Sequence, residues 1–202
     1  MGASANGLIK IGVRPNQIFT LSVVFAGVGG VCLILAGHDN SALSIAFFMA
    51  AAAFIVLRGF CNILDGVLAV KGGLKTKSGK NFNELPDRLS DPLLVVCTGF
   101  SIIEEGWAGL GWAAGILAVI TAYVRTLGRA AGASQHFCGP MAKEQRMTIL
   151  GLACMIAAPE ATLGVIPRET VYALLVVIIA CVTTVMHRSF VIVGELESKS
   201  AG

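Results

Sequence analysis

Long apolar runs separated by short polar stretches are the feature that most restricts the fold of this chain. A helix needs about 20 mostly apolar residues to cross a bilayer, and six runs come near that length. Only 13% of the 202 residues are charged, whereas soluble domains carry roughly 25%. The pattern predicts an all-α, polytopic membrane protein with six transmembrane helices, over about 17–37, 41 to past 60, 87–104, 108–127, 147–164 and 169–187.

The N-terminal residues 1–14 are too polar to span, and they carry Lys10 and Arg14 just before the first apolar run. We expect them to form an interfacial helix. The following run is longer than the apolar core of a signal peptide, so it should remain as a helix. The sequence contains no internal repeat, separate soluble domain or low-complexity segment, which predicts one domain over 1–202.

The distribution of Lys and Arg predicts the orientation of the chain. Six spans place both termini on one side, and all of the 15 Lys and Arg except Arg168 then lie on that side. Cations concentrate in cytoplasmic loops. We therefore expect both termini and the polar cluster described next to be cytoplasmic, as in a multi-pass protein of a bacterial inner membrane. Nothing in the composition points to nucleic acid.

Acidic and amide side chains gather in residues 58–91. Asn62 and Asp65 are three apart, and Asp87 and Asp91 are four apart, so in helices each pair shares one face. Hard divalent cations take oxygen ligands, usually a few carboxylates together with substrate phosphates. The spacing predicts a metal site that handles a diphosphate. The alternative is that each carboxylate only caps a helix or lies at the interface.

Other residues of this segment extend the predicted site. Arg58 and Ala69 lie on the helix face of Asn62 and Asp65. Arg58 either snorkels to lipid headgroups or pairs with an aspartate or a phosphate. Gly66 and Ala69 either let a nucleotide approach the backbone or are helix-packing contacts.

Two basic stretches accompany the acidic cluster. Residues 71–86 read as a polar loop, with Pro86 in the first turn of the third helix. Its cations could attract a diphosphate or simply follow the positive-inside rule. The second stretch follows the fourth helix and has the same two interpretations; its His136 receives no role. The cations of the two stretches are Lys71, Lys75, Lys77 and Lys80, then Arg125, Arg129, Lys143 and Arg146.

The acidic segment resembles the signature of the CDP-alcohol phosphatidyltransferase family, D-x2-D-G-x2-A-R, then a spacer and G-x3-D-x3-D. Upstream, Pro15-Asn16 and Thr20 resemble the P-N-x-x-T that opens the family's first membrane helix. The matching positions of the signature are Asp65-Gly66, Ala69, Asp87 and Asp91. The spacer is longer than usual, and three positions depart from the signature: Asn62 replaces the first aspartate, Val70 the arginine and Asn83 the glycine.

The resemblance implies transfer of a substituted phosphate from a CDP-linked lipid, such as CDP-diacylglycerol, to a hydroxyl acceptor with release of CMP. One or two Mg²⁺ or Mn²⁺ ions would be bound by Asp65, Asp87 and Asp91, with Asn62 as a weaker, neutral ligand. Asp91 would also act as the general base. Substrate would contact Asn16, Gly66, Ala69, Lys71, Lys75, Arg125, Lys143 and Arg146. Lipids of the membrane surround such an enzyme.

The resemblance also implies a homodimer, and Gly111 and Gly115 on the fourth helix have the small-xxx-small spacing of helix contacts. Two other functions stay open. A divergent member without catalysis would act as a lipid-binding or scaffold protein. Intramembrane prenyltransferases also hold a diphosphate through metal ions at helix ends, but they are longer than this chain.

Overall fold

The computed structural model describes residues 15–39, 42–71, 79–102, 107–161 and 168–200. Within these ranges the side chains of 15, 16, 65, 66, 68–71, 79–84 and 161 are not described. The predicted interfacial helix over 1–14 lies outside the described residues. So do the side chains of Asn16, Asp65, Gly66, Ala69 and Lys71, and all of Lys75.

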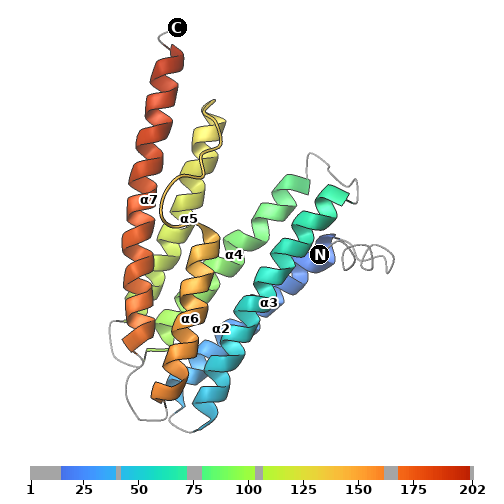
Figure 1. Ribbon diagram of the computed structural model, residues 1–202, viewed down its shortest axis with the longest axis vertical. Helices are drawn as coiled ribbons and strands as arrows, with labels where there is room; N and C mark the ends of the chain where they lie inside the picture. The colour runs from blue at the N-terminus through green and yellow to red at the C-terminus, as the bar shows by residue number, and fades with distance from the viewer. Residues whose placement is uncertain (1–14, 40–41, 72–78, 103–106, 162–167, 201–202) are drawn as a thin grey trace.

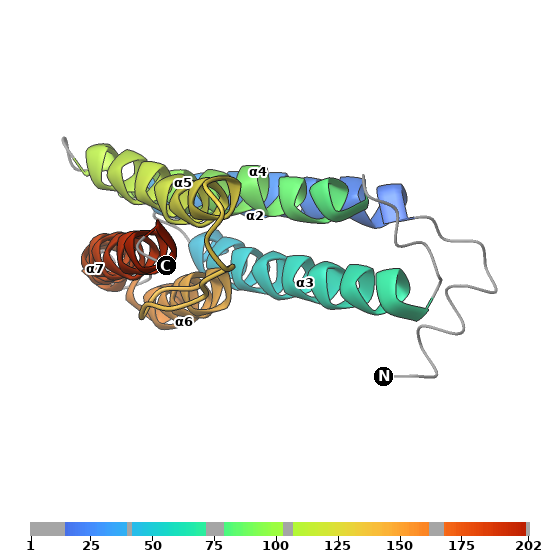
Figure 2. The ribbon, with the colours of Figure 1, turned by 90° about the horizontal axis from the view of Figure 1, so that it is seen from above.

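Six α-helices make up the described fold, which confirms the all-α prediction. They form two layers of three, with α2, α4 and α5 in one layer and α3, α6 and α7 in the other (Figure 2). Successive helices run in opposite directions along the long axis of the bundle (Figure 1). Their bounds are α2 Pro15–His38, α3 Leu43–Lys71, α4 Gly79–Phe100, α5 Ala108–Ala130, α6 Lys143–Ala161 and α7 Arg168–Ser200.

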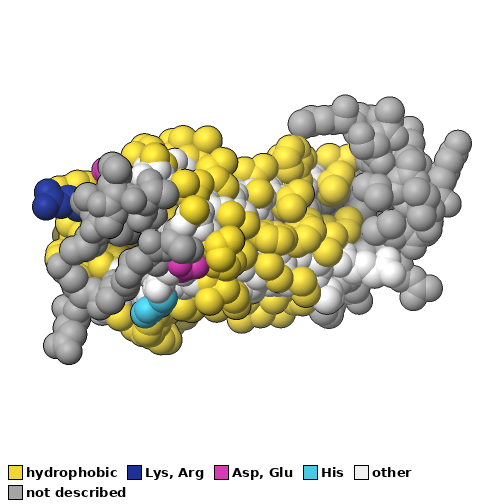
Figure 3. All heavy atoms as spheres, turned by 90° about the horizontal axis from the view of Figure 1, so that it is seen from below, with side chains coloured by type: hydrophobic (Ala, Val, Ile, Leu, Met, Phe, Trp, Pro, Cys, Tyr) yellow, Lys and Arg dark blue, Asp and Glu magenta, His cyan; other side chains and the backbone are white. Residues whose placement is uncertain are grey.

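Four of these helices, α2, α3, α5 and α7, are long and apolar enough to cross a membrane, which makes this an integral membrane protein. Helices α4 and α6 begin with polar turns, and α6 has only 19 residues. The prediction of six membrane spans therefore stays a prediction. The described side chains on the face shown in Figure 3 are mostly apolar, and large side chains such as Ile116 and Phe190 are exposed on the outside of the helices.

One apolar core joins the two layers. Leu33, Phe48, Leu94, Leu150 and Leu174 are completely buried in it, and they come from five different helices. Because lipid is as apolar as leucine, close packing rather than escape from water stabilises such a core within a membrane. This packing fixes the relative positions of the helix ends that carry the polar residues.

Two predicted helix boundaries are wrong. Helix α4 begins at Gly79, so Pro86 lies inside the helix and residues 79–86 are not loop. Pro159 likewise lies inside α6. Prolines are tolerated in membrane helices because neighbouring groups can bind the carbonyls that they free. Helix α7 continues beyond His187 to Ser200, where Glu195 contacts residues that follow α5.

Gly111 and Gly115 pack against α4 of the same chain, where α5 and α4 are in close contact. A Cβ atom at Gly111 would lie 2.8 Å from the Cα of Gly99 and 2.8 Å from the carbonyl oxygen of Val96. At Gly115 it would lie 2.9 Å from Cγ2 of Val96. The glycine pair therefore gives no support to the homodimer, which stays a prediction.

This contact predicts that alanine substitutions at two glycines of α5 differ in their effect on the stability of the protein. We expect Gly111→Ala to destabilise the bundle by about 1–3 kcal/mol, because its methyl group meets backbone atoms that cannot rotate away. Gly109→Ala is the control, since nothing lies within 4 Å of a Cβ there. Thermal unfolding of both variants in detergent measures the difference, and equal midpoints would contradict the close contact.

Candidate active site

Asp87 and Asp91 lie one turn apart on α4 and project from the same face. Their side chains are 14% and 2% exposed, so both are largely withdrawn from solvent. Buried carboxylates require partners, because an unpaired charge in such a position is costly. The neighbouring helices α3 and α6 supply three cationic side chains.

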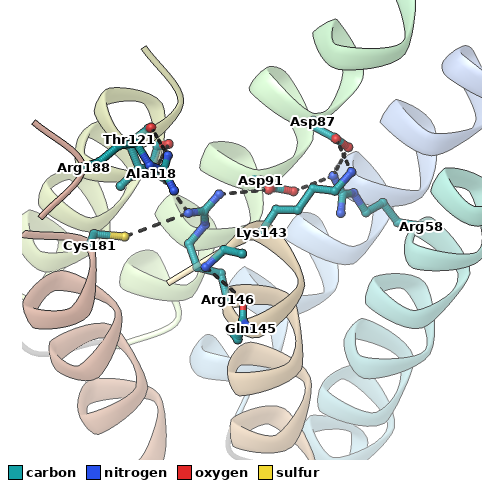
Figure 4. A network of polar contacts seen from close by, with 11 residues as sticks. Arg58, Asp87, Asp91, Ala118, Thr121, Lys143, Gln145, Arg146, Cys181 and Arg188 are labelled. Carbon is teal, nitrogen blue, oxygen red and sulfur yellow. Dashed lines mark hydrogen bonds and ion pairs between the residues drawn. The ribbon is translucent and has the colours of Figure 1, made fainter. Parts of the chain in front are cut away.

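Arg58 of α3 is the cation shared by the two aspartates. Its Nη2 atom lies 2.5 Å from Asp87 Oδ1 and 2.6 Å from Asp91 Oδ1, and its side chain is 2% exposed. Lys143 Nζ lies 2.6 Å from Asp87 Oδ2, and Arg146 Nη2 lies 3.3 Å from Asp91 Oδ2. Each carboxylate thus contacts two cations, and the five side chains join α3, α4 and α6 (Figure 4).

A second buried arginine network adjoins the first. Arg188 of α7 donates hydrogen bonds to the carbonyl oxygens of Thr121, at 2.6 Å, and Cys138, at 2.9 Å. Arg146 Nη1 lies 3.5 Å from Thr121 Oγ1, so Thr121 contacts both arginines. The network therefore continues from the aspartates through α6 to α5 and α7 (Figure 4).

The segment 131–142, which connects α5 to α6, is held against α7. Its Met141 N–H donates to Thr184 Oγ1, and its Ser134 hydroxyl donates to Glu195. His136, which the sequence left without a role, has Nε2 2.5 Å from Glu195 Oε2. Gly139 has φ +113°, a backbone conformation that residues other than glycine rarely adopt. These contacts fix the segment beside the arginine network.

A cavity of about 470 Å³ opens among α4, α5, α6 and segment 131–142. Arg125 lies over the Phe137 ring, 5.0 Å from its centre, and both residues line this cavity. Five cations face three carboxylates in the lining, so its charge favours an anionic ligand. They are Arg88, Arg125, Lys143, Arg146 and Arg188, against Asp87, Asp91 and Glu144.

A second cavity of about 420 Å³ lies between α3 and α6. Its lining combines apolar side chains, such as Val56, Phe60 and Met147, with Arg58, Asn62 and Lys143. Arg58 and Lys143 contact the aspartates that line the first cavity. The two cavities are therefore adjacent, one mainly cationic and the other mainly apolar.

The structure brings together part of the predicted site. Asp87, Asp91, Lys143 and Arg146 are in direct contact, and Arg125 lines the same cavity. Asn62 lines the second cavity instead. Sequence reasoning missed Arg188 and Thr121, and it left the partner of Arg58 open. The sequence could have pointed to Arg188 and to a partner for Arg58, because an arginine within or beside an apolar run needs a partner.

The oxygen-bearing side chains have the chemistry that a hard divalent cation requires. Asp91 Oδ1 accepts no hydrogen bond from the described residues, although Arg58 lies beside it. Among the described residues, no three His, Cys, Asp or Glu side chains form a group that could hold a metal ion. The donor types therefore fit Mg²⁺ or Mn²⁺, while both described carboxylates already contact cations of the protein.

Comparison with known proteins decides the family. The family model of the CDP-alcohol phosphatidyltransferases matches residues 13–186. This chain belongs to that family. The inner membrane protein YnbA of Escherichia coli K12 is 26% identical over 145 residues, which cover 72% of this chain and 68% of the relative.

Solved structures show the same fold for this family member. Phosphatidylinositol phosphate synthase of Mycobacterium tuberculosis with CDP-DAG bound superposes with a TM-score of 0.77 at 18% identity, covering 94% of this chain and 92% of that one. The complex of that enzyme with manganese and citrate has a TM-score of 0.76 at 17% identity, covering 94% and 87%. The resemblance predicted from the aspartate spacing is confirmed at the level of family and fold.

Proposed function

We propose that this protein transfers a substituted phosphate from a CDP-linked lipid, such as CDP-diacylglycerol, to a hydroxyl acceptor and releases CMP. The observation that carries the proposal is the pair Asp87 and Asp91 on the wall of a cationic cavity, in a chain of this family. A structural relative that binds CDP-DAG supports the choice of donor. The adjacent apolar cavity suits the acyl part of such a lipid.

Asp91 is the proposed general base. The acceptor hydroxyl attacks the lipid-side phosphorus while its proton passes to an Asp91 oxygen. The new O–P bond forms as the bond to the CMP oxygen breaks, and CMP leaves with the electron pair. Asp91 Oδ1 forms an ion pair with Arg58 at 2.6 Å, which favours the ionised carboxylate that a general base requires.

Asn62, Asp65, Asp87 and Asp91 are the proposed ligands of Mg²⁺ or Mn²⁺. When bound, such an ion neutralises charge on the phosphoryl oxygens. Lys143 and Arg146 add positive charge beside the aspartates and orient the phosphate oxygens. Gly66, Ala69, Asn16, Lys71 and Lys75 are proposed to contact the donor. We propose that this site faces the cytoplasm.

A second candidate function is lipid binding without catalysis. It is favoured by Asn62 at the position of the first signature aspartate, and by the two cations on each described carboxylate. Release of CMP from CDP-diacylglycerol by the purified protein with Mn²⁺ separates the two. Turnover that requires both the metal and an acceptor supports the enzyme. Binding of the lipid without any CMP release supports the second candidate.

The surplus of cations in the cavity predicts which acceptors work best. We expect glycerol phosphate or inositol phosphate to give a kcat/KM about 10-fold or more above serine or inositol, because a charge-assisted hydrogen bond contributes about 1.5–3 kcal/mol. Arg125→Met should reduce this preference. Arg129→Met is the matched control, one turn further along α5 and outside the cavity. Equal rates with charged and uncharged acceptors would contradict the expectation.

A further inference from the structure

Arg58 occupies the position between the two carboxylates that a bridging cation would take. Its Nη2 atom lies within 2.6 Å of an oxygen of both Asp87 and Asp91. It belongs to a side chain that is 2% exposed and that comes from the helix carrying Asn62. The guanidinium borders the second cavity and is held by both aspartates. It is therefore part of the site rather than a mobile surface charge.

The charge balance of the described residues explains why a cation of the protein can lie between the two aspartates. Arg58, Lys143 and Arg146 contact Asp87 and Asp91, so three positive charges face two negative ones. Asn62 stands where the signature has its first aspartate, so one negative charge is missing, and Arg58 places a positive charge between Asp87 and Asp91.

A divalent ion bridging Asp87 and Asp91 would have to displace Arg58 or lie beside it. Displacement would leave a buried, unpaired guanidinium, and removing one partner of a buried ion pair is strongly destabilising. Placing two cations side by side costs Coulomb energy that grows as the site becomes less polar. Both routes disfavour a second metal ion that bridges Asp87 and Asp91.

We infer that Arg58 replaces one metal ion of the site, so that this protein binds one divalent ion and uses the guanidinium as the fixed cation between Asp87 and Asp91. The inference rests on the proposed function only for the existence of the remaining ion. Arg58 is then a positioning residue, because it holds both aspartates in place.

Counting bound Mn²⁺ tests the inference without measuring turnover. The protein is placed in phosphatidylcholine nanodiscs, and free Mn²⁺ is measured by electron paramagnetic resonance against empty nanodiscs. We expect one ion per chain in the wild type and in Arg129→Met, an exposed arginine away from the aspartates. Arg58→Met should bind two ions, because it removes the cation that Asp87 and Asp91 share and leaves each carboxylate with one contacting cation, Lys143 or Arg146. Arg58→Met with Asn62→Asp should bind the second ion more tightly.

Two ions or none in the wild type would overturn the inference, and so would a count of one in a folded Arg58→Met protein. If the methionine variant cannot be recovered folded, the wild-type count decides, together with Arg58→Lys, which keeps the charge and should still bind one ion. A different result would refute the proposed function. A wild type with one Mn²⁺ and no CMP release refutes the enzyme, whereas CMP release with two ions refutes the role of Arg58.

Discussion

Replacing Asp91 with asparagine should lower CMP release by on the order of 10² or more, the usual contribution of a positioned general base. The amide keeps the size of the side chain but cannot take a proton from the acceptor hydroxyl. Binding of CDP-diacylglycerol and Mn²⁺ should largely survive, so we expect kcat to fall with little change in KM for the lipid. Steady-state rates at saturating metal measure both quantities.

Glu197→Gln is the control for this prediction, because it removes one carboxylate near the end of α7, outside both described cavities. Asp87→Asn gives the contrast. As a proposed metal ligand, Asp87 should mainly affect the Mn²⁺ concentration needed for turnover. Near-normal turnover of the Asp91 variant at saturating Mn²⁺ would show that another group removes the proton.

Replacing Arg188 with methionine should produce the largest loss of stability among the predictions made for this chain. Arg188 is 5% exposed and donates to backbone carbonyls of α5 and of segment 131–142. Each charge-assisted hydrogen bond contributes about 1.5–3 kcal/mol. For a chain of this length, a loss of about 3–5 kcal/mol lowers the unfolding midpoint by on the order of 10 °C.

Differential scanning fluorimetry in detergent measures this shift. Arg129→Met again serves as the matched control, because Arg129 is exposed at the end of α5. Arg188→Lys should restore only part of the midpoint, since one ammonium group cannot reproduce the fork of a guanidinium. An unchanged midpoint for the methionine variant would mean that α5, α7 and segment 131–142 are held together by other contacts.

Much of the fold was predictable because it depends on local patterns. Long apolar runs determine helices, and most of these helices occur close to their predicted ranges. The four-residue spacing placed Asp87 and Asp91 on one face, which requires only a helical backbone. Their spacing also carries the resemblance to the family. The end at Ser200 was missed because it depends on contacts of Glu195 and Lys199 with the segment that follows α5.

The sequence by itself determined the all-helical class and the family, and it predicted a polar site on α3 and α4. Tertiary structure alone decided which charges meet. Arg58 pairs with Asp87 29 residues away, Arg146 with Asp91 55 residues away, and Arg188 with the carbonyl of Thr121 67 residues away. Gly111 in the same way faces Gly99 of a neighbouring helix rather than a second copy of the chain. Periodicity states which face of a helix is polar, but only the packing of one helix against another selects the partner on the facing surface.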